Sequence, residues 1–197
     1  MCDSDSQPVL TTEDTEYISA NFIALAEACR SSGQSLSGVR QRISQGELPK
    51  PSYRLNDGTE MVPSDYFALT ESADGRPLKD VFEERYADAA RELGAPISEE
   101  LLAAEWEGYL SGDYGVCLRG LTPENICAKR WHMGEIERLL AEEDPGAPEW
   151  RRSLAEHVSA LDRLERPFAE YDRVRWGPVS RDRLITGVRE RYPDAFR

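Results

Sequence analysis

The sequence predicts a mostly α-helical protein with one β-hairpin near its N-terminus. In most segments apolar residues recur every three or four positions, and most of these segments begin at a capping Ser or Thr or at a Pro. The clearest strand signal is a pair of short extended runs around Asn56-Asp57-Gly58, a sequence that favours a tight hairpin turn. We therefore expect an N-terminal module with one hairpin, followed by a helical bundle.

The expected helices cover most of the chain. The first begins at Thr11 or Thr12 and continues to Ser31, with a break near Asn21. Further helices are expected to begin near Ser35, Pro63, Pro77, Ser98, Thr122, Trp150 and Ser180. The segment 167–179, rich in aromatic residues and Arg, is predicted to be a loop.

Charge is unevenly distributed along the 197 residues, whose formal net charge is −13. Residues 71–149 carry 19 acidic and 8 basic residues, whereas residues 30–56 carry 5 basic residues and 1 acidic residue. The C-terminal residues 166–197 carry 8 Arg and 5 acidic residues. Ion pairing between the basic ends and the acidic middle explains this pattern most simply, and the acidic body disfavours non-specific binding to nucleic acid.

The N-terminus and the cysteines indicate a cytoplasmic protein. Residues 1–10 are polar and lack the cationic start and apolar centre of a signal peptide, and we expect them to form a mobile tail. Four Cys are scattered without a CxxC motif, which is typical of a reducing compartment. No run approaches the roughly 18 apolar residues of a membrane span, so no membrane partner is expected.

Signatures of metal and nucleophilic chemistry are missing from the sequence. The two histidines, His132 and His157, do not combine with the cysteines in a common zinc spacing. There is no GxSxG nucleophile motif and no phosphate-binding glycine loop. We expect no metal and no cofactor.

The segment Glu105 to Arg119, EWEGYLSGDYGVCLR, has an unusual composition that directs attention to it. It combines three Gly and two Tyr with the carboxylates of Glu105, Glu107 and Asp113, and its first cation is Arg119. Asp113 is expected at the C-terminal end of a helix, where the helix dipole disfavours a negative charge. This position suggests a cationic partner for Asp113.

Acid–base chemistry by carboxylates is the interpretation that remains for this segment. A carboxylate buried beside aromatic rings has a raised pKa and suits a general base. The candidate catalytic residues are Asp113, Glu105, Tyr109 and Tyr114, and the candidate substrate-binding residues are Trp106, Arg119, Tyr171, Arg173, Arg175 and Trp176. The alternative is structural: the aromatic residues belong to the core, the acids pair with the arginines, and the loop docks the last helix.

Residues Val39 to Val62 resemble the small winged helix-turn-helix module of MerR and excisionase-like proteins. The order helix, Gly turn, helix, GELP and hairpin carries this resemblance. It implies a helix that enters the major groove with Arg40 and Arg42, and a wing near Lys50 and Arg54. Four bases beside an acidic body are few, so we do not expect DNA binding. We predict a winged module over residues 11–73 and a helical domain over 76–197.

A second resemblance covers nearly the whole chain, from about Tyr17 to Pro193. The segments LPKPSYRLNDGTEMVPSDYFAL, EWEGYLSGDYGVCLRGLTPENI, ERPFAEYDRVRWGPVSRDRLI and RYP resemble a family of small bacterial natural-product biosynthesis proteins. The resemblance implies a pathway to amino-acid-derived metabolites, some with strained nitrogen rings. It implies no particular catalytic residue.

These observations lead to two functional hypotheses. The first is a cofactor-free enzyme that acts on a small amino-acid-derived intermediate, with Asp113 or Glu105 as general base and an Arg holding an anionic group. Proton abstraction from an amine, followed by intramolecular displacement, would close a ring. The second is a binding protein, either a regulator of the pathway or a partner of another pathway enzyme. A homo-oligomer is also compatible with the sequence.

Overall fold

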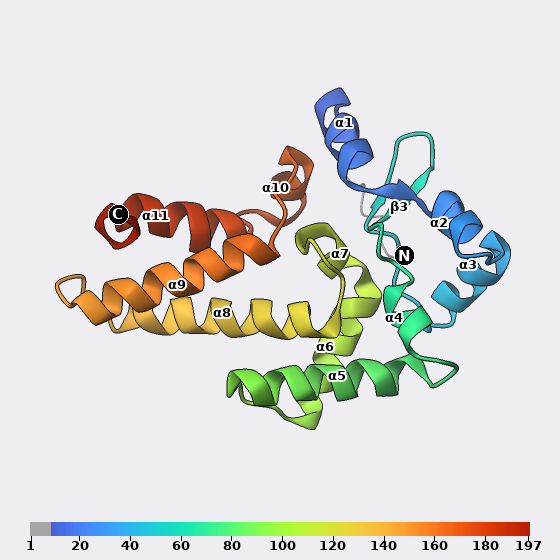
Figure 1. Ribbon diagram of the computed structural model, residues 1–197. Coiled ribbons are helices and arrows are strands. Elements are labelled where there is room, and N and C mark those ends of the chain that lie inside the picture. The colour runs from blue at the N-terminus through green and yellow to red at the C-terminus, as the bar shows by residue number, and fades with distance from the viewer. Residues whose placement is uncertain (1–8) are drawn as a thin grey trace, which may run out of the picture.

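The computed structural model describes residues 9–197 and confirms the predicted fold class: a mostly helical protein with a small antiparallel sheet near the N-terminus (Figure 1). Most of the predicted mobile tail, residues 1–8, lies outside the described residues. Leu10 is buried in the hydrophobic core, and its carbonyl oxygen accepts a hydrogen bond from the Asn56 side chain at 2.9 Å.

The N-terminal module combines short helices with a three-stranded sheet in the order β1-β3-β2. Its elements are α1 (Thr12–Asn21), β1 (Ile23–Ala24), α2 (Leu25–Ser31), α3 (Leu36–Ser44), β2 (Tyr53–Arg54), β3 (Glu60–Val62) and α4 (Ala68–Ser72). The predicted break near Asn21 is confirmed, because α1 ends there. The predicted hairpin is also present, and Gly58 adopts φ 86° in its turn. The sequence did not predict β1, which is only two residues long and pairs with β3.

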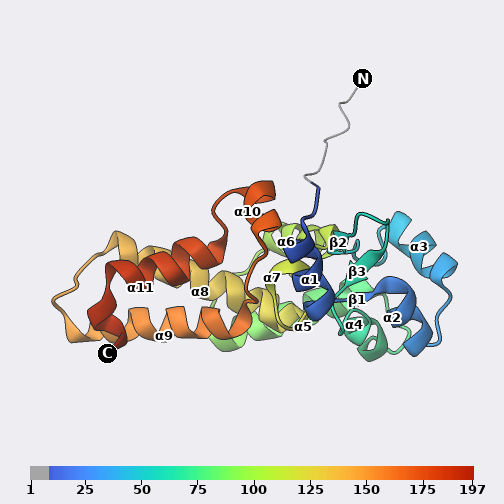
Figure 2. The same ribbon diagram turned by 90° about the horizontal axis from the view of Figure 1, so that it is seen from above.

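The remaining helices form an elongated body (Figure 2), at one end of which α8 and α9 run antiparallel, side by side (Figure 1). The elements are α5 (Leu78–Leu93), α6 (Glu99–Ser111), α7 (Asp113–Cys117), α8 (Pro123–Ala141), α9 (Pro148–Leu164), α10 (Glu170–Trp176) and α11 (Gly187–Arg191). A π-helical turn, Asp182–Thr186, leads into α11, and a 3₁₀ turn, Pro193–Phe196, follows it. As predicted, Thr122 caps α8 through its hydroxyl and Pro123 occupies the first turn.

Two hydrophobic cores stabilise these elements. The first contains Ile18, Val62, Phe82 and Tyr109, so it extends from the N-terminal module into the helical part without interruption. The second lies between α8, α9, α11 and the π-helical turn before α11, and contains Ile136, Leu154 and Ile185 among other residues. The predicted boundary between the two modules, at residues 73–76, remains a prediction, and the first core continues across it.

One predicted loop is in fact partly helical, since α10 occupies Glu170–Trp176 within the segment 167–179. The Asp172 carboxylate accepts hydrogen bonds from the Ala169 backbone N–H and from the Tyr53 hydroxyl, both at 2.9 Å. These contacts hold the start of α10 against β2 of the N-terminal module. Seven residues are too few for a clear apolar periodicity, so tertiary contacts rather than a local pattern specify this helix.

Within residues 9–197, no helix combines the length and the apolar character that crossing a membrane requires.

Candidate functional site

The segment 105–119 forms a sharp corner between α6 and α7. Gly112 ends α6 in the left-handed conformation, with φ 86°, and Asp113 is the first residue of α7. Asp113 therefore lies at the start of a helix and not at the end of one. This corrects the expected unfavourable position, because the N-terminal end of a helix dipole favours a negative charge.

The three glycines of this corner each permit a close contact. A Cβ atom on Gly112 would overlap the Lys50 carbonyl oxygen, and one on Gly115 would overlap the Ser52 hydroxyl. A Cβ atom on Gly108 would lie 2.8 Å from the Tyr114 ring. The corner also binds the N-terminal module directly, since the Lys50 N–H donates to the Leu110 carbonyl oxygen at 2.9 Å. The glycines thus join the two parts of the chain and position Tyr114.

Glu105 and Tyr114, two predicted catalytic residues, are in direct contact. The Glu105 side chain is 2% exposed, and its carboxylate accepts a hydrogen bond from the Tyr114 hydroxyl. Arg130 of α8 donates to the other carboxylate oxygen at 2.7 Å. The buried charge therefore has both a neutral donor and a cationic partner, as a buried carboxylate requires.

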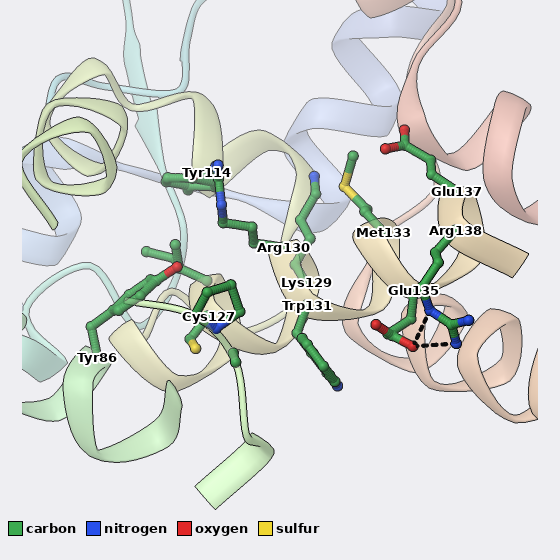
Figure 3. Close-up of a pocket in the computed structure, with 14 residues that line it drawn as sticks. Tyr86, Tyr114, Cys127, Lys129, Arg130, Trp131, Met133, Glu135, Glu137 and Arg138 are labelled. Atoms are coloured by element: carbon green, nitrogen blue, oxygen red, sulfur yellow. Dashed lines mark hydrogen bonds and ion pairs between the residues drawn. The ribbon is translucent and has the colours of Figure 1, made fainter. Parts of the chain in front are cut away.

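A cavity of about 660 Å³ opens beside this group (Figure 3). Tyr86 of α5, Tyr114 of α7 and Arg130 of α8 gather on one side of it, whereas Glu135, Glu137 and Arg138 lie on the other. The remaining lining is mainly apolar: Ala95, Pro96, Ile126, Cys127, Trp131 and Met133, together with Lys129 and Gly134. An apolar cavity with a few convergent polar groups is the usual form of a small-molecule site.

The tyrosines and the cysteine around this cavity are shifted toward their neutral forms. Burial raises the pKa of Tyr114, and the neighbouring Glu105 carboxylate raises it further. Burial and Glu105 likewise raise the pKa of Tyr86, whose hydroxyl contacts the Cys127 thiol. Burial also raises the pKa of Cys127. At neutral pH, Tyr114 is therefore a protonated phenol that donates to Glu105.

Tyr109 and Trp106 do not line this cavity. Their rings stack on one another with centroids 5.4 Å apart, and both pack against Phe82 in the first core. The Tyr109 hydroxyl is buried and has no hydrogen-bond partner among the residues that the structure describes. Both side chains lie in the first core, which is the position that the structural alternative gives them.

Most of the predicted arginine contacts also have a structural role. Arg173 donates two hydrogen bonds to the Asp182 carboxylate, at 2.8 and 2.9 Å, and thereby ties α10 to the π-helical turn. Arg119 is exposed, and its backbone N–H donates a hydrogen bond to the Leu164 carbonyl oxygen. Its side chain does not pair with Glu105, whose cationic partner is Arg130. Trp176 is 40% exposed and lies beneath the Arg175 guanidinium. Arg173 and Arg119 thus do not reach the Glu105 group.

Asp113, Tyr171 and Arg175 meet at a second cavity, of about 720 Å³. It lies where the corner, α10 and the winged module come together, and Lys50, Tyr53, Arg54 and Glu60 complete much of its wall. Arg175 approaches the Asp113 carboxylate to 3.7 Å. The predicted site is therefore divided: Glu105 and Tyr114 belong to the first cavity, while Asp113, Tyr171 and Arg175 belong to the second.

Sequence reasoning did not identify four of the cavity-lining residues as part of a site: Tyr86, Cys127, Arg130 and Lys50. Cys127 and Arg130 are three residues apart, so they share one face of a helix, but nothing local indicates that this face meets Glu105. Lys50 was assigned to a wing, whereas the structure places it at the second cavity. In residues 9–197 no cluster of three or more His, Cys, Asp or Glu side chains could hold a metal ion.

Comparisons with known proteins place the helical part of the chain in a family. Residues 78–193, more than half of the chain, match a family of unknown function, DUF6058. No curated protein matches the sequence, and no solved structure matches the fold. All residues that line the first cavity lie within the matched segment, whereas the second cavity also uses residues 43–60, outside it. The chain belongs to the DUF6058 family.

Proposed function

We propose that the protein is an enzyme of natural-product biosynthesis that acts on a small amino-acid-derived intermediate in the first cavity. The proposed reaction is an acid–base-assisted cyclisation by intramolecular displacement, carried out by the chain's own side chains. The pathway and the substrate class rest on the sequence resemblance. The choice of cavity rests on the contact between Tyr114, which lines it, and the buried Glu105.

Tyr114 is the group that would contact the substrate, because Glu105 is buried behind it. As a protonated amine of the substrate loses one proton to the Tyr114 oxygen, the phenol proton passes to the Glu105 carboxylate along the existing hydrogen bond. The amine nitrogen then uses its freed electron pair to displace a leaving group on a nearby carbon, which closes a ring. Proton transfer by a positioned side chain contributes a factor of roughly 10² to 10⁴ in rate.

Arg130 is suited to hold the anionic end of the substrate or the departing anion. One of its guanidinium nitrogens is bonded to Glu105, and its side chain is 58% exposed at the cavity. A guanidinium can bind a carboxylate or phosphate through several parallel donors. The apolar side chains of Ile126 and Met133 would cover the rest of the substrate and limit the access of water.

The competing function, a DNA-binding regulator, is less well supported by the winged module. Arg40 pairs with Glu60 at 2.8 Å, and Arg42 pairs with Glu47 at 3.3 Å. Arg54 pairs with Glu60 as well. These acids neutralise side chains that would contact phosphate groups, and phosphate contacts supply most non-specific affinity for DNA.

Gene replacement in the cells that express the protein tests the enzyme proposal. Cells with Tyr114→Phe or Glu105→Gln should accumulate a small molecule, the substrate. Purified wild-type protein should convert this molecule, and neither purified variant should convert it at more than about a hundredth of the wild-type rate. The matched control is Tyr109→Phe, which removes a tyrosine hydroxyl from the core and should leave the extract unchanged. Variant extracts that equal the wild-type extract, while deletion of the gene alters it, would overturn the site assignment.

A further inference from the structure

The second cavity is a mixed-charge site at the junction of three parts of the fold. Its walls come from the winged module (Lys50 to Arg54 and Glu60), from the α6–α7 corner (Ser111 and Asp113) and from α10 (Arg175). At about 720 Å³ it has ample room for a small metabolite. It shares no lining residue with the first cavity.

The charges around this cavity are incompletely paired. Arg54 is bonded to Glu60, which also accepts from Arg40 outside the cavity. Arg175 and Asp113 approach only to 3.7 Å, and the Asp113 side chain remains 53% exposed. Lys50 is exposed and forms no ion pair with any residue in 9–197. The Lys50 ammonium, the loosely paired Arg175 guanidinium and the loosely paired Asp113 carboxylate therefore line the same cavity.

The balance of charge defines the ligand that fits. Three basic and two acidic side chains line the cavity, which leaves one positive charge in excess within a protein of net charge −13. A complementary ligand carries two anionic groups and one cationic group. Lys50 and Arg175 would bind the anionic groups, and Asp113 would bind the cationic group.

We propose that this cavity binds an α-amino acid with an acidic side chain, such as L-glutamate or L-aspartate. The ligand's ammonium group contacts Asp113, and its carboxylates contact Lys50 and Arg175. Because these residues belong to three different parts of the fold, the bound ligand braces the winged module against α7 and α10. Binding therefore raises the melting temperature of the whole chain.

Isothermal titration calorimetry of the full chain at neutral pH and low salt tests the proposal. The probes are L-glutamate, L-aspartate, L-glutamine and glutarate. L-Glutamate or L-aspartate should bind more tightly than L-glutamine, which lacks the second anionic group, and than glutarate, which lacks the ammonium group. Lys50→Met and Arg175→Met should each weaken the binding by about tenfold or more, as expected for the loss of a charged hydrogen bond.

Two controls locate the binding. Lys79→Met removes an exposed lysine of α5, whose partner is Glu83, and should leave the dissociation constant unchanged. Tyr114→Phe alters the first cavity and should also leave it unchanged, so failure of this proposal and failure of the proposed enzyme function are separable. Absence of binding by all four probes at millimolar concentration overturns the proposal, as does equal binding of glutarate, or wild-type affinity in Lys50→Met and Arg175→Met.

Discussion

Gly115 lies directly against Ser52, so that a Cβ atom on Gly115 would overlap the serine hydroxyl oxygen. The Ser52 hydroxyl in turn donates a hydrogen bond to the Gly112 carbonyl oxygen at 3.2 Å. The N-terminal module and the α6–α7 corner therefore fit together through backbone and a small hydroxyl. This tight junction separates the two cavities and places Tyr114 toward one and Asp113 toward the other.

Replacement of Gly115 by Ala should loosen this junction. The added methyl group also meets Pro63 at 2.9 Å, and we expect a loss of about 1 to 3 kcal/mol in the free energy of unfolding, as for overpacking in a core. Gly134→Ala is the matched control, because Gly134 lies in α8 with open space around it. That change should increase stability by up to about 1 kcal/mol through helix propensity. Urea denaturation of both variants measures the difference, and a Gly115→Ala variant as stable as wild type would contradict the close contact.

The corner also shows which parts of the fold could be predicted from the sequence. The capping residues Thr11, Ser98 and Thr122 and the turn at Gly58 are local signals, and the elements they predict are present. The role of Gly115 depends on Ser52, which is far away in the sequence, so composition revealed only that the segment was unusual. The helix α10 was missed for the same reason, because Asp172 is held by the distant Tyr53.

The candidate site was predicted in part. Reasoning from the segment 105–119 identified Glu105, Tyr114 and Asp113, but it assigned them to one pocket, since the sharp turn at Gly112 could not be oriented from sequence. It expected the cationic partners of the carboxylates to be Arg119, Arg173 and Arg175. The structure pairs Glu105 with Arg130 instead, and the two side chains meet because α6 and α8 both pack against α5.

Tyr109→Phe and Tyr114→Phe should have different effects on the free energy of unfolding. The Tyr109 hydroxyl is buried without a partner among the described residues, so its removal should leave the free energy of unfolding unchanged or slightly raised. Removal of the Tyr114 hydroxyl deprives the buried Glu105 carboxylate of a donor and should destabilise the protein by about 1 to 3 kcal/mol. Thermal and urea unfolding of the two variants make the comparison. Equal stability of the two variants would argue against a strong Tyr114–Glu105 interaction.

Stability should fall as the pH decreases from about 6.5 toward about 4, because of His132 and His157. Their Nδ1 atoms lie 2.9 Å apart between α8 and α9. Burial, reinforced by His157, lowers the pKa of His132 from 6.5 to about 4, and burial lowers the pKa of His157 as well. The unfolded chain therefore binds more protons than the folded chain in this range, and unfolding becomes easier as the pH falls. Since both rings are partly exposed, we expect an effect of about 1 to 2 kcal/mol.

Denaturant titrations at a series of pH values measure this effect, and the double variant His132→Gln/His157→Gln provides the control. Its stability should vary much less in this range. Carboxylates with lowered pKa, such as Asp162 and Asp182, lose their contribution only at lower pH, below their unfolded value of about 3.9. An unchanged pH dependence in the double variant would show that other groups are responsible.

Loss of one charge of the buried Lys129–Glu165 ion pair should destabilise the protein more than loss of both charges. The Lys129 ammonium lies 3.0 Å from the Glu165 carboxylate and 2.9 Å from the Cys117 sulfur, and the Glu165 side chain is fully buried. Although burial alone would lower the pKa of Lys129, Cys117 and Glu165 raise it, so the lysine is charged at neutral pH.

Lys129→Met leaves the Glu165 carboxylate buried without a cation and should destabilise the protein by about 3 to 5 kcal/mol. The double variant Lys129→Met/Glu165→Gln removes both charges and should recover part of that loss, since the remaining amide can still accept from the Ser180 hydroxyl. A double-mutant cycle of unfolding free energies measures the coupling. If the changes in unfolding free energy of the two substitutions simply add, the coupling energy is zero, and the two charges do not stabilise each other.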